Sequence, residues 1–347
     1  MAKRLTEAQL MDEASPSPAL ESARKAVADL EQENKKLKQQ VGSDEALFEC
    51  IRDELEALEP YKRRAVPKGS GKHAEHAAVA IIADTHSDEY VDSAEIEGIA
   101  GHEWSDHETR MSLFADKVGE ITDIVRQSSE VNTLNVWLLG DFFVGQIHPE
   151  ENEYSPGLPL PRALPAEGRV LADTILRMGA GFDKVRVVGM VGNHGRTTRK
   201  PAFKMRADRN WDTAVYLIAQ EIASKADHIE WCFPRSAMHV EDVMGTKNLL
   251  THGDVIQVTH RTPYFAIEDT FFKQRDARRT TDVDFDHVWM GHFHHAFQIR
   301  DWIHGCPSMV GDSQYSLYKM HTKSSAAQSL VFFTEKHGPT TEWRISL

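Results

Sequence analysis

Three histidines lie within four residues in the stretch VWMGHFHH, residues 288–295, at the end of an apolar run. Imidazole nitrogens bind first-row divalent metals, and they are also common on solvated loops that bind nothing. A metal site would need carboxylate, amide or further imidazole ligands at equivalent positions elsewhere in the chain. The composition of the other apolar runs therefore decides between the two interpretations.

Five apolar runs of strand length end in Asp, Asn or His, and they cover residues 77–84, 134–141, 185–194, 248–254 and 287–295. Buried strands of α/β folds present functional groups at their carboxyl ends in this way. The polar side chains at these ends are Asp84, His86, Asp141, Asn193, His194, His252, His292 and His294. This set matches a centre of two divalent ions about 3.5–4 Å apart, with one carboxylate bridging them.

The five blocks resemble, in order, those of the calcineurin-like metallophosphoesterases, whose pattern runs DxH, GD, GNH, H, GHxH. Here they read DTH at 84–86, GD at 140–141, GNH at 192–194, HG at 252–253 and GHFH at 291–294. A single GD or HG occurs by chance in most proteins. Five blocks in the family's order, each at the end of an apolar run, are far more specific.

The resemblance implies two divalent metal ions, for which we expect manganese, with iron, zinc or magnesium as alternatives. It implies that the first ion is bound by Asp84, His86, Asp141 and His294. It implies that the second is bound by Asp141 as a bridge, Asn193, His252 and His292. His194 would be the catalytic residue that protonates or stabilises the leaving oxygen, while a metal-bound hydroxide attacks phosphorus in line.

Alternation along a strand separates the three histidines of the last block. Residues two apart point to the same side, so His292 and His294 should face the metals together. His295 should point the opposite way, and we predict that it binds no metal. Metal content of the single variants tests this division.

Two positions depart from the family pattern. Many members have an acid three residues after GD, where this chain reads GDFFV at 140–144. Many also have an acid after GNH, where this chain has Gly195 followed by Arg196. Neither position binds metal in the family. The departures therefore concern the orientation of the ligand loop and of His194, and Arg196 reverses the charge expected there.

A basic segment follows the GNH block. Residues 196–209 carry six Lys or Arg side chains with only Asp208 opposing them. Such a segment beside a phosphodiester-cleaving centre favours a polyanionic substrate. We predict Arg196, Arg199 and Lys200 as substrate-binding residues and a nuclease acting on DNA or RNA, similar to the DNA-repair exonuclease branch of the family.

Three alternatives stay open. The basic residues can be ordinary surface side chains, as the formal net charge of −13 suggests. The enzyme can instead be a phosphodiesterase or phosphatase for small nucleotides or phosphoproteins. A non-catalytic scaffold with a vestigial metal site is the remaining class, although His194 beside a full ligand set argues against it.

The alternation of apolar runs with helical patterns predicts an α/β fold, and the resemblance implies a four-layer α-β-β-α sandwich of two mixed sheets. We expect the metals between the sheets at the strand ends. The catalytic domain should span 76–347, following a basic linker at 60–75. The strand-rich end of the chain is expected to complete the second sheet.

The N-terminal part reads as a disordered tail at 1–18 followed by a helical arm at 19–59. Heptad spacing favours a parallel two-stranded coiled coil over 20–41 in which a buried Asn34 fixes the register, and hence a homodimer. Its a and d positions are Leu20, Ala23, Val27, Leu30, Asn34, Leu37 and Val41. An amphipathic helix docked on its own catalytic domain explains the spacing equally well.

Composition sets the remaining limits. With 347 residues and 41% hydrophobic content, the chain is long enough for one large catalytic domain with an appendage. Three isolated cysteines in no CxxC spacing argue against disulfides and thiolate zinc, so any metal has N and O ligands. No signal peptide or run of about 18 apolar residues occurs, so we expect a cytoplasmic protein with no membrane partner.

Overall fold

The computed structural model describes residues 56–64, 74–145, 147, 160–198, 200–201, 203–256 and 263–347. The chain divides into two units, Met1–Cys50 and Ile51–Leu347. The predicted tail and coiled coil lie outside the described residues.

Six strands form the first sheet in the order β11-β10-β1-β2-β3-β4. Their bounds are β1 Glu75–Ile82, β2 Glu130–Leu138, β3 Lys184–Gly189, β4 Ile229–Cys232, β10 Ala327–Thr334 and β11 Gly338–Ser346. Strands β1 to β4 run parallel, while β10 is antiparallel to β1 and β11 to β10. The carboxyl ends of β1, β2 and β3 therefore meet at one edge of this sheet.

Five shorter strands form the second sheet in the order β5-β6-β7-β9-β8. Their bounds are β5 Met238–Val243, β6 Thr246–Thr251, β7 His287–Met290, β8 Phe297–Ile299 and β9 Ile303–Gly305. The three central strands β6, β7 and β9 are parallel, and the outer two are antiparallel to their neighbours. Both sheets are mixed, as predicted.

The end of the chain does not complete the second sheet, contrary to the expectation. Strands β10 and β11 instead extend the first sheet through pairing of β10 with β1. All but the last residue of β10 are buried. A strand buried on both faces belongs inside a sheet that is covered on both sides, and the place beside β1 provides this.

The main core lies between the two sheets. Trp137 of β2 and Trp289 of β7 meet there with ring centroids 5.7 Å apart, and both pack near Phe333 of β10. Small apolar side chains of β1 complete this layer. Burial of this large aromatic area holds the two sheets together, and it positions the strand ends of one sheet next to those of the other.

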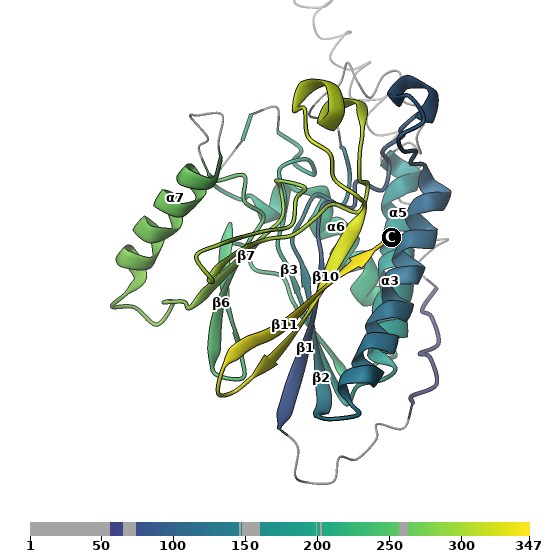
Figure 1. Ribbon diagram of the computed structural model, residues 1–347. Helices are drawn as coiled ribbons and strands as arrows, with labels where there is room; N and C mark the ends of the chain where they lie inside the picture. The colour runs from purple at the N-terminus through teal and green to yellow at the C-terminus, as the bar shows by residue number, and fades with distance from the viewer. Residues whose placement is uncertain are drawn as a thin grey trace, which may run out of the picture. The chain divides into compact units, whose positions relative to one another are not determined.

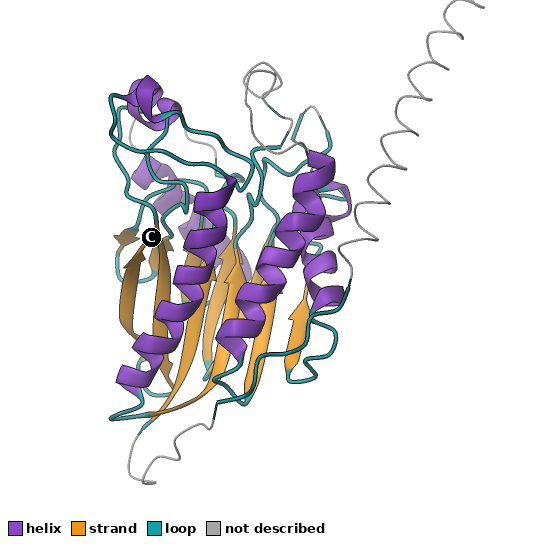
Figure 2. Cartoon of the chain, turned by 90° about the vertical axis from the view of Figure 1, so that its right-hand side faces the viewer, coloured by secondary structure: helices purple, strands orange, loops and turns teal. Residues whose placement is uncertain are grey.

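Helices cover the outer faces. Figure 2 shows two long helices lying across the first sheet, α3 Trp104–Val125 and α5 Leu160–Gly179. The shorter α6 Trp211–Ile222 packs beside α5, and its Ile218 touches Gly168. On the other side of the molecule α7 Pro263–Arg278 packs its Ile267 and Phe271 against the second sheet (Figure 1). The predicted four-layer α-β-β-α sandwich is therefore confirmed.

Short helical turns occur in the loops, at η1 Ser93–Ile96, η2 Ala207–Arg209 and η3 Tyr315–Lys319. Residues 56–64 form neither helix nor strand. They lie along the helical layer, where the Leu58 N–H donates to the carbonyl of Ile222 at 3.0 Å and the Tyr61 hydroxyl donates to Asp173 at 2.7 Å. Among the described helices, none combines the length and apolar composition needed to span a membrane.

Candidate metal centre

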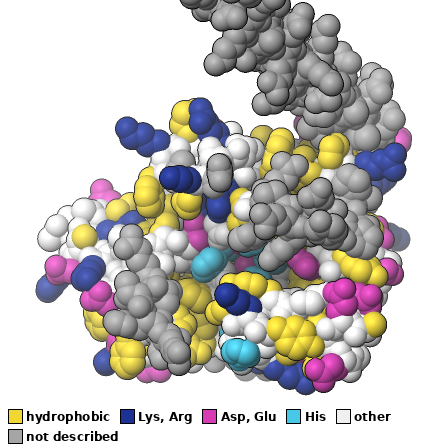
Figure 3. All heavy atoms as spheres, turned by 90° about the horizontal axis from the view of Figure 1, so that it is seen from above, with side chains coloured by type: hydrophobic (Ala, Val, Ile, Leu, Met, Phe, Trp, Pro, Cys, Tyr) yellow, Lys and Arg dark blue, Asp and Glu magenta, His cyan; other side chains and the backbone are white. Residues whose placement is uncertain are grey.

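The predicted site residues come from both sheets and meet where the strands end. Each lies in the loop directly after β1, β2, β3, β6 or β7. Seen from this end, histidine and acidic side chains lie in a hollow near the middle of the face, with Lys and Arg side chains beside it (Figure 3). The fold thus gathers residues that are more than 200 positions apart in the chain.

One cluster consists of Asp84, His86 and His294, whose ligand atoms all lie within 4.8 Å of one another. The Nε2 atoms of His86 and His294 are 3.2 Å apart, and Asp84 Oδ1 lies 3.5 Å from His294 Nε2. Asp84 and His86 are buried. Both oxygens of Asp84 also accept the backbone N–H of His292, at 3.0 and 2.9 Å, which ties β1 to the loop after β7.

The second cluster consists of Asp141, His252 and His292, again with ligand atoms within 4.8 Å of one another. His252 Nε2 lies 2.8 Å from Asp141 Oδ2 and 3.1 Å from Asn193 Oδ1. The structure therefore brings together all seven predicted metal ligands. Asp141 groups with the second cluster alone, so its bridging role stays a prediction.

These donor atoms fit divalent cations. The Nδ1–H of His252 donates to the carbonyl of Leu139 at 2.7 Å, which leaves Nε2 as the atom that faces the cluster. Asp141 Oδ2 is buried and accepts no well-oriented hydrogen bond, although His252 Nε2 is close. A buried carboxylate oxygen and converging imidazole nitrogens form the N and O ligand set that manganese, iron or zinc accepts.

Electrostatics in the metal-free protein support the same conclusion. Burial, with the charges of His194 and His294, lowers the pKa of His86 to about 3. Burial also lowers the pKa of His252, but the carboxylate of Asp141 outweighs it and raises the value to about 10. A proton on His252 thus compensates part of the negative charge of the carboxylates, as a bound cation would. Metal binding has to displace this proton.

The backbone is left-handed at five of the predicted ligands. Their φ values are 51° for Asp84, 40° for His86, 56° for Asp141, 69° for His292 and 59° for His294. Asp and His tolerate this region better than most residues, yet it carries strain of about 1–3 kcal/mol per residue. Ligand geometry is therefore set by the loops rather than by extended strands.

This corrects the alternation argument for the last block. Strand β7 ends at Met290 and the backbone is left-handed at His292 and His294, so a two-residue period does not describe these two positions. The two histidines reach different clusters, as the resemblance implies. His295 is half-buried and belongs to neither cluster.

Two glycines in the motifs make room for carboxylates from other motifs. A Cβ atom on Gly192 would overlap the carboxylate of Asp141. A Cβ atom on Gly291 would lie 2.5 Å from Asp84 Oδ2. Neither glycine has a positive φ, so the requirement here is space and not backbone freedom.

His194 lies beside the first cluster. Its ring meets the ring of His86 edge to face, with centroids 4.8 Å apart. Its Nδ1–H donates to the carbonyl of Val144 at 2.9 Å, and its backbone N–H donates to Asp141 Oδ1 at 2.7 Å. These contacts hold the ring at the edge of the centre with Nδ1 as a donor.

Sequence reasoning missed Asp212, at the start of α6. Its buried carboxylate accepts the backbone N–H groups of Asp141 and Phe142 at 3.1 Å and of Gly192 at 2.8 Å. Asn210, also missed, donates to the carbonyl of Gly192 and caps α6 by accepting the N–H of Asp212. Only the N-cap pattern before α6 could have drawn attention to them.

The predicted substrate-binding residues have separate surroundings. Arg196 donates to the carbonyls of Asn193 and Thr198, at 2.9 and 3.2 Å, and so lies beside a predicted ligand. Lys200 is exposed, and Arg199 lies outside the described residues. A second missed contact joins Arg206 to Asp254 through two hydrogen bonds of 2.8 and 2.6 Å, linking the basic segment to the loop that carries His252.

Comparison with known proteins gives structural likenesses of low identity. No family model matches the sequence. No curated protein matches it either. A predicted phosphoesterase from Streptococcus pneumoniae is 12% identical, with a TM-score of 0.29 over 78% of this chain and 98% of that one.

Two vacuolar protein sorting 29 structures are similar to the same extent. The protein from Cryptosporidium parvum is 10% identical, with a TM-score of 0.32 over 79% of this chain and 100% of that one. The zinc complex from Entamoeba histolytica is 12% identical, with a TM-score of 0.30 over 78% of this chain and 98% of that one. At this level of similarity no function can be transferred, and the chain's own site residues must indicate its chemistry.

Proposed function

We propose that this protein is a metal-dependent phosphodiester hydrolase with two divalent ions, for which manganese is the expected metal. The observation that carries the proposal is the pair of clusters Asp84, His86, His294 and Asp141, His252, His292 at one edge of two sheets. A site for a single structural ion would need only one such cluster. Paired N and O ligand sets beside a further histidine are typical of two-metal hydrolysis.

The bound ions supply a low pKa for a water molecule and neutralise the charge that builds on the phosphoryl oxygens. The chain's own residues do the rest. Asp84 and Asp141 hold negative charge at the end of β1 and β2, where burial makes an uncompensated carboxylate costly and favours cation binding. Asn193 Oδ1 lies 3.1 Å from His252 Nε2, so both residues would hold the second ion.

His194 is proposed to act on the leaving oxygen. Because its Nδ1–H is used by the carbonyl of Val144, Nε2 is the ring atom that can face substrate. A protonated Nε2 donates its proton to the departing alkoxide, as a general acid does. The hydrogen bond from the His194 backbone N–H to Asp141 holds this residue next to the metal centre.

The proposed substrate is a polynucleotide, in keeping with the resemblance to the DNA-repair exonuclease branch. Its support is the basic segment 196–209, whose Lys200, Lys204 and Arg209 are exposed and form no ion pair with other described residues. Cationic side chains next to a hydrolytic centre attract a polyanion and hold its backbone. Turnover restricted to small nucleotides or phosphoproteins would instead favour the alternatives.

The test is hydrolysis by the full-length protein loaded with manganese. The substrates are bis(p-nitrophenyl) phosphate, a labelled single-stranded oligonucleotide and a labelled duplex. We expect cleavage of the small diester and of at least one nucleic acid, with stronger salt inhibition for the polyanion. His194→Ala should abolish turnover of both while the protein keeps its two metal ions.

His295→Ala is the matched control, since it removes a neighbouring histidine that belongs to neither cluster. It should retain turnover and metal content. Unchanged turnover in His194→Ala would refute the assigned role. Absence of turnover in the wild-type protein with two bound ions would contradict the enzyme proposal and favour a scaffold.

A further inference from the structure

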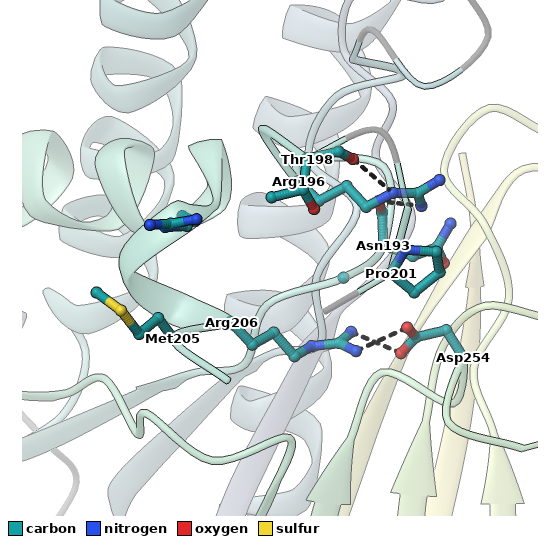
Figure 4. Close-up of a pocket in the computed structure, with 9 residues that line it drawn as sticks. Asn193, Arg196, Thr198, Pro201, Met205, Arg206 and Asp254 are labelled. Carbon is teal, nitrogen blue, oxygen red and sulfur yellow. Dashed lines mark hydrogen bonds and ion pairs between the residues drawn. The ribbon is translucent and has the colours of Figure 1, made fainter. Parts of the chain in front are cut away.

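A pocket opens directly beside the second cluster. Its lining includes Asn193, Arg196, Met205, Arg206, Arg209 and Asp254. Figure 4 shows Arg196 above the Arg206–Asp254 pair, with Asn193 and Pro201 between them. The pocket therefore shares Asn193 with the candidate metal centre.

The lining carries excess positive charge. Three guanidinium groups, those of Arg196, Arg206 and Arg209, are opposed within the lining by the carboxylate of Asp254 alone. That carboxylate is already occupied by its paired hydrogen bonds with Arg206. The charges of Arg196 and Arg209 consequently have no carboxylate partner in the pocket.

Hydrogen-bond donors are also left over. Arg206 Nε is buried and has no acceptor among the described residues. The guanidinium of Arg209 forms no hydrogen bond or ion pair within the described part of the chain. Arg196, by contrast, is held by the carbonyls of Asn193 and Thr198, so its planar group is fixed in advance. An oxyanion is the ligand that fits such a set of donors.

We propose that this pocket is a phosphate-binding subsite for the phosphate next to the scissile one in a polynucleotide. The inference rests on the proposed hydrolytic function and adds a substrate class, a chain with at least two phosphodiesters. Met205, which lines the pocket and is 56% exposed, offers an apolar surface against which a base can lie. A small diester has no second phosphate and leaves the pocket unused.

Arg209→Gln is the sharpest variant, because it removes a charge that forms no hydrogen bond or ion pair with the described residues. Arg279→Gln is the matched control, an exposed arginine after α7 in the outermost layer. Thymidine trinucleotide and dinucleotide differ by one phosphodiester. We expect Arg209→Gln to lower the ratio of their kcat/KM values by about tenfold, the loss expected for one charge-assisted contact. Arg209→Lys should restore part of the ratio.

A binding measurement makes the test independent of turnover. The probe is a labelled oligothymidylate with phosphorothioate linkages, titrated at several salt concentrations. Loss of one phosphate contact should reduce the slope of log K against log salt by about 0.7 for a single strand. Arg279→Gln should leave the slope at its wild-type value.

The outcomes separate the two proposals. A lower ratio and a lower slope in Arg209→Gln alone support the subsite. If both stay at wild-type values, the subsite is wrong even though the enzyme cleaves diesters. ADP serves as a small-nucleotide probe in the same binding measurement. If Arg209→Gln weakens the binding of ADP but leaves the salt dependence of oligothymidylate binding unchanged, the pocket binds a small nucleotide and the polynucleotide assignment is wrong. An Arg209-dependent slope without any hydrolysis keeps the subsite and rejects the hydrolase.

Discussion

The carboxylate of Asp212 accepts the backbone N–H of Asp141 at 3.1 Å and that of Gly192 at 2.8 Å, so one side chain of α6 joins the loops after β2 and β3. Many members of the family that the sequence blocks resemble have acids after GD and after GNH, which this chain lacks. We infer that Asp212 supplies from a distant position the bracing of the ligand loop that those acids were expected to provide.

Asp212→Ala should destabilise the protein by about 3 kcal/mol or more, because three buried N–H groups lose their acceptor at about 1–3 kcal/mol each. Metal affinity should also fall, since Asp141 loses its brace. Urea unfolding of the metal-free protein and metal content after dialysis measure the two effects. Asp208→Ala, which removes an exposed pair with Arg235, should cost much less. Equal losses in the two variants would exclude a bracing role.

His294→Ala should lose one of two metal ions, whereas His295→Ala should keep both. The reason is that His294 Nε2 lies 3.2 Å from His86 Nε2 within a cluster, while His295 belongs to none. Metal content of the purified variants after manganese loading measures this. Loss of metal from His295→Ala alone would mean that the last block was assigned to the wrong histidine.

The unfolding free energy should fall with pH below about 6.5, in part because of His304. This ring stacks on Trp289 with centroids 3.9 Å apart, and burial, with the charge of His287, lowers its pKa to about 3. Below the ordinary histidine pKa of about 6.5, His304 therefore binds a proton in the unfolded chain but not in the folded protein. Stability present above pH 6.5 is lost progressively as pH falls towards 3.

One such group costs about 1 kcal/mol between pH 7 and 5.5. His304→Gln should flatten the pH dependence of urea unfolding by this amount, whatever its effect at neutral pH. His337→Gln, which removes an exposed histidine in the turn between β10 and β11, is the comparison. Parallel pH curves for wild type and His304→Gln would show that the ring is protonated in the folded state.

Removal of residues 1–50 should convert a dimer into a monomer if the heptads of 20–41 form a coiled coil. Truncation at 50 rather than 60 keeps the contacts of Leu58 and Tyr61 with the helical layer. Sedimentation of the two proteins at equal concentration decides the matter. An unchanged oligomeric state would favour the docked helix, and so would a monomeric full-length protein.

Local patterns in the sequence predicted the α/β fold and the polar residues at the strand ends, whereas the four layers and the division of the ligands between two clusters came from the resemblance to a known family. An apolar run that ends in Asp84 or His252 identifies a buried strand and its carboxyl end at once. The runs overestimated the strands, since β3 ends at Gly189 and β7 at Met290. The loop after β7 is left-handed at His292 and His294, which a two-residue period cannot describe.

Contacts between residues far apart in the sequence could not be predicted, because local patterns carry no information about them. Asp212 lies 71 residues after Asp141, and nothing in its neighbourhood resembles a ligand motif. The pairing of Arg206 with Asp254 joins a basic segment to a different strand end. The position of β10 next to β1 likewise depends on where in the fold both of its faces are covered, which is a property of the assembled core.

The two crowded glycines show that the sequence blocks form one interlocking unit. Gly192 of GNH makes space for the Asp141 carboxylate of GD, and Gly291 of GHFH makes space for the Asp84 carboxylate of DTH. A methyl group added in one block would thus displace the ligand of another. Gly192 and Gly291 therefore have to remain glycine for as long as the carboxylates of Asp141 and Asp84 occupy these positions.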